Sequence, residues 1–297
     1  MSSAPSSPDD TLAFAPPPVV ASGMGEASLP SGYLGLGIIG RSEVSVVHRA
    51  HDLSTGATVA VSVPTDPLHA DREVIARVAR VTHPAAIRVL GEARCGTGTC
   101  CVMEFVEGRP VSEVLPLLRD RVLHALTLDD LVAVCCIDRR RLHPEIASLA
   151  RGRGVWHRLA VRWMIDVCGV VRESHGLGLS NLSPRPSRLL LRSDGRVAVT
   201  GLGLASIDPD PASRGADVRD LVACLKELLT LRADPSVAAA RAMPAELSVA
   251  CDECLTRTDA DRALTDLSDA MERWLARPFA TGVVGLMRRF WPAAGTT

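Results

Sequence analysis

The sequence predicts an α+β fold in which a small antiparallel β-sheet lobe with one helix precedes a larger, mainly α-helical lobe. Short β-branched runs separated by turn residues lie between Tyr33 and Phe105, and from Val111 onward apolar residues recur at helical spacing. A chain of 297 residues that is 47% hydrophobic and 23% charged can bury a sizeable core. Disorder throughout the chain is therefore excluded.

The first lobe is assigned to residues 32–106. Val44–Arg49 and Thr58–Val63 predict two strands, because the turn residues His51–Gly56 between them favour an antiparallel hairpin. Apolar residues repeat at helical spacing over Asp71–Val81, which predicts one helix. Two further strands are expected at Ile87–Leu90 and Thr99–Phe105.

The second lobe is assigned to residues 107–280, with a polar insertion at about 118–154. Helices are expected at Val111–Leu118, Trp156–Ser174, Ala216–Leu231, Val237–Arg241, Ala245–Leu255 and Leu264–Ala276. A small hairpin is embedded among them: Leu189–Leu191, a turn at Ser193–Gly195, and Val197–Thr200. In the C-terminal tail, 281–297, Gly282–Pro292 predicts a short amphipathic helix that packs on the helical lobe or contacts a membrane.

Residues 1–31 are rich in Ser, Pro, Ala and Gly and are expected to form a disordered tail. No basic residue precedes Arg41, and Asp9 and Asp10 oppose the charge of a secretory signal. No apolar stretch is long enough to span a membrane, and nine cysteines are an odd number that fits a reducing compartment. We therefore expect a cytoplasmic protein.

Charge and cysteine spacing exclude several classes of partner. The net charge of −1 disfavours a nucleic-acid partner. Cys251 and Cys254 form one C-x-x-C pair, but structural zinc needs four ligands and no second pair follows, so no metal is expected. The basic residues include a single lysine, Lys226, so chemistry that requires a lysine elsewhere is excluded.

Several motifs lie in the order and spacing of one family. They are Gly40–Val47 as a glycine-rich loop, His83-Pro84 before a strand, Val102–Gly108 as a hinge, Asn181–Leu191 as a catalytic loop, Gly195–Ala205 as a metal-binding motif, Asp217 on a central helix, and Asp259 with Arg262 near the end. Between Tyr33 and Pro278 the chain resembles the protein kinase superfamily, most closely its bacterial serine/threonine branch. The resemblance implies a bilobal protein-kinase-like fold.

The same resemblance implies that the phosphoryl-transfer positions are replaced. Ser62 stands where the family has the phosphate-gripping lysine, and Ser183 where it has the catalytic aspartate. Arg188 stands at the asparagine of the second metal, and Gly201 at the aspartate that binds magnesium. Glu73, at the position of the glutamate that pairs with the lysine, has no such partner. We therefore expect no catalytic residue, no bound metal and no enzyme, but a pseudokinase.

A residual adenine pocket is implied by the positions that enclose the base in the family, Gly40, Val47, Ala60, Met103, Glu104, Val106 and Leu190. The alternative is that these residues only pack together. Ser42 and Ser45 replace two loop glycines and hinder a close approach to phosphate. No cofactor is expected; the alternative is ATP held weakly and without magnesium.

Three functions follow in order of preference. The first is a protein-interaction or allosteric module that uses the N-terminal tail 1–31 and the insertion 118–154. Its protein partner is not identified. The second is a weak binder of a nucleotide or small molecule, and the third an enzyme of altered mechanism. Asp138–Arg141 is a solvated helix end or a docking patch. His143, His157 and His175 are taken as ordinary helix or turn residues.

Overall fold

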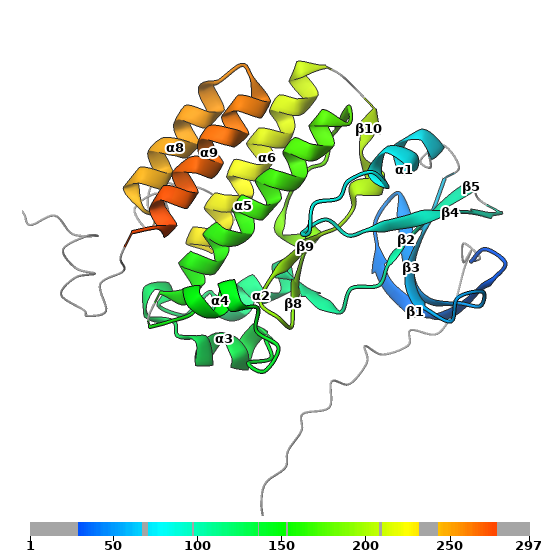
Figure 1. Cartoon of the computed structure of the whole chain (residues 1–297), viewed down its shortest axis with the longest axis horizontal. Helices are drawn as coiled ribbons and strands as arrows, with labels where there is room; N and C mark the ends of the chain where they lie inside the picture. Colours follow the sequence, from blue (N-terminus) through cyan, green and yellow to red (C-terminus); the bar gives the residue numbers. More distant parts are fainter. Residues whose placement is uncertain are drawn as a thin grey trace, which may run out of the picture.

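We analysed a computed structural model of the chain, which describes residues 29–66, 71–96, 98–135, 137–152, 154–207, 210–231 and 243–277. Three predicted segments lie outside these residues: positions 1–28 of the N-terminal tail, the helix Val237–Arg241, and the C-terminal tail 281–297. The rest forms a β-sheet lobe and a helical lobe that lie side by side (Figure 1). This α+β architecture confirms the predicted fold class.

The first lobe is a five-stranded antiparallel sheet with strand order β1-β2-β3-β5-β4. One helix, α1, lies beside it (Figure 1). The elements are β1 (Tyr33–Arg41), β2 (Ser45–Asp52), β3 (Thr58–Pro64), α1 (Arg72–Val78), β4 (Val89–Cys95) and β5 (Gly98–Glu104). Asp71 begins α1 by accepting a hydrogen bond from the Glu73 N–H at 2.8 Å.

Strand β5 is shared by two hydrophobic cores. Cys100 and Val102 belong to a small core of six buried residues within the sheet lobe. Cys101, which points to the opposite face, belongs to the large core that extends through the helical lobe. Because neighbouring residues of one strand belong to different cores, a change in β5 affects both lobes.

The helical lobe is built around α5 (Val155–Gly176), which packs against α6 (Pro211–Thr230) and α9 (Ala260–Leu275). Trp156 and Trp163 stack edge to face with ring centroids 5.4 Å apart. The other elements are β6 (Gly108–Pro110), α2 (Val111–Leu118), η2 (Leu123–Ala125), α3 (Leu128–Cys135), α4 (Pro144–Leu149), β7 (Leu179–Ser180), η3 (Pro186–Arg188), β8 (Leu189–Arg192), β9 (Val197–Val199), η4 (Leu202–Leu204), β10 (Ser206–Ile207) and α8 (Ala245–Thr256).

Several element boundaries differ from the sequence prediction, and at two of them specific hydrogen bonds explain the difference. The strand expected at Ile87–Leu90 begins at Val89, because the Ile87 N–H donates to the Val199 carbonyl of β9 at 3.0 Å instead of joining the sheet. The helix expected from Ala216 begins at Pro211, because Asp210 caps it through the Ala212 N–H and proline suits the first helical position.

The insertion 118–154 folds into η2, α3 and α4 and packs on the helical lobe. Leu131 and Ile146 are fully buried in the large core. The buried Arg158 of α5 donates to the carbonyls of Leu149 and Arg151, both at 2.6 Å. The insertion is therefore anchored to α5 by both packing and hydrogen bonds.

Within the described residues, no helix is both long and apolar enough to cross a bilayer. The same residues contain no cluster of three or more His, Cys, Asp or Glu side chains suited to a metal ion.

Candidate functional site

The segment predicted as a catalytic loop lies between β7 and β8 and is tied to α6 through Asp217. Asn181 and Ser183 have positive φ angles of 57° and 46°, which are unusual for residues other than glycine. The buried Asp217 carboxylate accepts the Ser183 N–H through Oδ1 at 3.0 Å. This hydrogen bond to a charged acceptor holds the loop in its unusual conformation.

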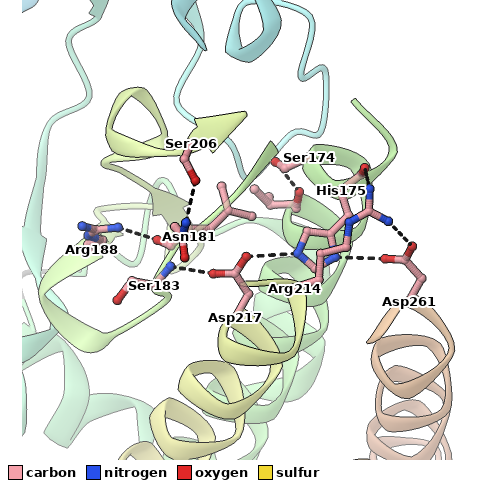
Figure 2. Close-up of polar contacts among 11 residues, drawn as sticks. Ser174, His175, Asn181, Ser183, Arg188, Ser206, Arg214, Asp217 and Asp261 are labelled. Carbon is pink, nitrogen blue, oxygen red and sulfur yellow. Dashed lines mark hydrogen bonds and ion pairs between the residues drawn. The ribbon is translucent and has the colours of Figure 1, made fainter. Parts of the chain in front are cut away.

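Asp217 also belongs to a partly buried network that joins three helices (Figure 2). Its Oδ2 lies 3.1 Å from Nε2 of His175 on α5, whose Nδ1 lies 2.9 Å from Oδ1 of Asp261 on α9. Arg214 of α6 donates to Asp261 Oδ2 at 3.4 Å and to the His175 carbonyl at 3.0 Å. His175 is thus a polar residue of α5, as expected, and both of its ring nitrogens face carboxylates.

Arg188 and Gly201 contact each other. They stand at the two positions where the resemblance places the metal ligands of the family. Gly201 has φ 77°, and a Cβ there would lie 3.2 Å from Cδ and Nε of Arg188. Nη1 of Arg188 donates to the Leu182 carbonyl of the catalytic loop (Figure 2). Burial lowers the pKa of Arg188 and nearby Arg185 adds to this, while the carboxylates of Asp220 and Asp217 oppose it. A guanidinium thus occupies the region where the family binds a metal cation.

Ser62 and Glu73, the positions of the family's ion pair, have separate surroundings. Ser62 on β3 pairs with Val47 of β2 and Cys101 of β5 in the sheet. Glu73 forms an ion pair with Arg77 one helical turn later at 2.5 Å, and its side chain is 63% exposed. An ion pair at this exposure contributes about 0–1 kcal/mol to stability. Glu73 thus has an arginine partner on its own helix.

The glycine-rich loop between β1 and β2 is closed by its own serines. Ser42 Oγ accepts the N–H groups of Val44 at 3.3 Å and Ser45 at 3.1 Å. The Ser42 N–H in turn donates to the Ser45 carbonyl at 2.9 Å. Backbone N–H groups of such a loop can cradle phosphate, and here a side-chain hydroxyl already accepts two of them.

Some of the predicted adenine-pocket residues are neighbours in the sheet. Gly40 pairs with Val47, and Ala60 pairs with Met103. Leu190 lies on β8 in the second lobe. The Glu104 N–H and carboxylate are both engaged with the Arg88 backbone, at 2.9 Å and 3.1 Å. A nucleotide in this pocket remains a prediction, as does the role of Val106.

The insertion is joined to the hairpin that leads into the metal-binding motif. The N–H groups of Asp138 and His143 donate to the carbonyls of Ser193 and Asp194 in the β8–β9 turn, at 2.8 Å and 3.0 Å. A Cβ at Gly195 in that turn would lie 2.7 Å from Ile146, so only glycine fits. Sequence reasoning missed this contact, for which the glycine in the turn was the only available signal.

Comparisons with known proteins agree with this geometry. No family model matches the chain. A serine/threonine-protein kinase, pkn2 of Myxococcus xanthus, is 33% identical over 131 residues, which are 38% of this chain and 16% of that relative. The PknI kinase domain of Mycobacterium tuberculosis has a TM-score of 0.58 at 20% identity, covering 84% of this chain and 99% of that domain. A variant of the same domain gives a TM-score of 0.59 at 19% identity, with 85% and 99% covered.

The bilobal fold is that of a protein kinase-like domain. Over 131 residues the sequence is also similar to a bacterial serine/threonine-protein kinase. It spans about a sixth of the length of the curated relative that it matches.

The prediction that the chain is not an enzyme is contradicted by these comparisons. The curated relative is a serine/threonine-protein kinase and the similar solved structures are kinase domains, which indicates an enzyme.

Proposed function

We propose that this chain is a regulatory domain of the kinase fold that acts by binding a protein partner at the insertion 118–154. The observation that carries the proposal is the pair of hydrogen bonds from Asp138 and His143 to the β8–β9 turn. This hairpin continues into Thr200 and Gly201 of the metal-binding motif. A partner bound on the insertion would therefore act on a segment that is hydrogen-bonded to the hairpin before the metal-binding motif.

The exposed surface of the insertion suggests the chemistry of the partner. Arg140 and Arg141 are exposed at the turn before α4, and Val122 is 57% exposed. Arg139 is engaged with Asp129 of α3. Exposed arginines favour an acidic partner surface, since arginine is enriched at protein interfaces.

The test compares proteins captured from the native host on two matched double variants. Arg140→Glu with Arg141→Glu reverses two charges on the insertion, and Arg94→Glu with Arg273→Glu reverses two exposed charges elsewhere. We expect a protein that the wild type and the control capture equally, and that the insertion variant captures at least about tenfold less, as the loss of 1.4 kcal/mol would give. Equal recovery on all three proteins would contradict the proposal.

A second candidate function is the binding of a nucleotide without magnesium, and the position of Arg188 favours it. A guanidinium can neutralise phosphate oxygens and donate hydrogen bonds to them, as a metal ion would otherwise neutralise them. Arg188 is half-buried and lies beside the motif where the family binds magnesium. The residual pocket would hold the base and Arg188 the phosphates.

Thermal unfolding with ATP in the presence of magnesium or of EDTA tests this second function. Ligand at ten times its Kd stabilises the folded state by about 1.4 kcal/mol, which raises the midpoint by roughly 3–6 °C for a domain of this size. We expect the same rise with EDTA, and its loss in Arg188→Gln. A rise that requires magnesium would refute metal-free binding. Transfer of the γ-phosphate, measured on the same samples, reports whether the chain shares the activity of its relatives.

A further inference from the structure

The hairpin of β4 and β5 brings two cysteine thiols into contact. The sulfur atoms of Cys95 and Cys100 are 2.7 Å apart. Cys95 pairs with Gly98 and Cys100 pairs with Ala93, so both side chains lie on the same face of the hairpin at a diagonal. A disulfide bond is about 2.04 Å long, so the two sulfurs need to move together by only about 0.7 Å.

The two thiols differ in their access to solvent. Cys100 is fully buried in the small sheet core, together with Val61 and Val63. Cys95 is half-buried at the end of β4, and its thiol also lies 3.4 Å from the Gly98 carbonyl. An oxidant from solvent would therefore reach Cys95 first, and Cys100 is the sulfur in place to respond.

We propose that Cys95 and Cys100 form a reversible intrachain disulfide when the protein meets a peroxide. The Cys95 thiolate attacks one peroxide oxygen and breaks the O–O bond, which gives a sulfenic acid on Cys95 and a hydroxide. This hydroxide takes up the proton that the Cys95 thiol lost and leaves as the first water. The Cys100 sulfur then displaces the sulfenic hydroxyl, the S–S bond forms, and the proton of Cys100 leaves with that hydroxyl as a second water. Two thiols are oxidised and one peroxide is reduced, and a dithiol reverses the bond.

The effect of this bond follows from the core that it joins. The small core has six buried residues, and the link would join one of them, Cys100, to Cys95 at the end of β4. The next residue, Cys101, faces the other side of β5, where its Sγ would lie 3.6 Å from a Cβ at Gly203 in the metal-binding motif. The disulfide would thus fix β5, the strand whose other face lies beside the metal-binding motif.

Other cysteines provide a contrast within the same chain. Cys251 and Cys254 on α8 form a C-x-x-C pair, yet the Cys254 thiol contacts the Ala263 carbonyl at 3.5 Å. Burial raises the pKa of Cys251 to about 12 and that of Cys254 to about 11, and it raises the pKa of the Cys100 thiol as well. The two pairs therefore differ in solvent access, since Cys95 is half-buried whereas Cys251 and Cys254 are both buried. Cys254→Ala is therefore a control that leaves the hairpin pair intact.

The experiment treats the full chain with dithiothreitol or with hydrogen peroxide and measures intact mass, cysteine connectivity by peptide mapping, and the thermal midpoint. We expect the wild type and Cys254→Ala to lose two hydrogen atoms, with the link between Cys95 and Cys100. We also expect their midpoint to rise by about 4 °C or more relative to the reduced form. Cys95→Ser and Cys100→Ala should show neither the link nor the rise.

Three results would overturn the proposal: a disulfide that maps to other cysteines, oxidation without an intrachain link, or an oxidised form that unfolds at or below the midpoint of the reduced form. Because each variant is compared with its own reduced form, a substitution that lowers stability does not obscure the result.

Discussion

Substitution of Asp217 should release the loop that carries Ser183. The buried carboxylate accepts the Ser183 N–H at 3.0 Å and faces His175 Nε2 at 3.1 Å. Asp217→Ala leaves both groups without this partner inside the protein. Each of these two hydrogen bonds to the buried carboxylate contributes about 1.5–3 kcal/mol, so their joint loss costs about 3–6 kcal/mol. We therefore expect the free energy of unfolding to fall by that amount.

Asp217→Asn removes the negative charge at position 217 but keeps the size and shape of the side chain. The amide oxygen can still accept the Ser183 N–H, but the charge opposite His175 is lost. A hydrogen bond to a charged group contributes about 1.5–3 kcal/mol, so this variant should lose about that much and less than the alanine variant. Asp252→Asn is the control. The Asp252 side chain is 68% exposed, so its ion pair with Lys226 at 3.2 Å should contribute at most about 1 kcal/mol to stability.

Urea denaturation measures the three free energies, and hydrogen exchange follows the Ser183 amide. We expect faster exchange of that amide in both Asp217 variants, because the hydrogen bond to Asp217 holds Ser183 at its positive φ of 46°. The reasoning is refuted if Asp217→Ala costs no more than the control, or if Ser183 stays as protected as in the wild type.

Three further changes test other parts of the structure. Trp163→Phe removes the indole donor to the Gly195 carbonyl at 2.8 Å and should lower the free energy of unfolding by about 1–3 kcal/mol in urea denaturation. Burial, with the charges of His124 and Arg158, lowers the pKa of His157 to about 4, below its unfolded value of about 6.5. The unfolded chain therefore binds more protons, so about 3 kcal/mol of stability should be lost as pH falls from 6.5 towards 4, and His157→Gln should flatten that profile. Gly201→Ala should cost about 1–2 kcal/mol in the same denaturation assay for its positive φ of 77°, and Gly201→Asp should cost less because its carboxylate would face Arg188.

The order of lobes and most elements could be predicted because local patterns determine them. The helix Val111–Leu118 and the hairpin of β8 and β9 follow from apolar spacing and from the turn Ser193–Gly195. The start of β4 was misplaced because the Ile87 N–H bonds to Val199, far away in the sequence. Such a competing partner has no local signal.

The candidate site was predictable by position but not by contact. The resemblance located Ser183 and Asp217, but the network that joins them to His175, Asp261 and Arg214 depends on how α5, α6 and α9 pack. A histidine between two carboxylates requires three segments to meet, which no spacing in the sequence encodes. The order of the insertion was left open for the same reason, since its short helices are stabilised by packing on α2 and α5.

Arg188 and Gly201 belong to two different replaced motifs of the sequence but lie next to each other in the structure. The arginine side chain lies where a side chain at position 201 would begin, so a larger residue there requires Arg188 to move. Arg188 in turn donates to the Leu182 carbonyl in the loop that Asp217 holds. A side chain restored at position 201 alone would therefore meet a guanidinium instead of a metal ion. If a nucleotide binds beside Arg188, either this side chain neutralises the phosphates or the nucleotide displaces it. The magnesium dependence of binding distinguishes these two outcomes.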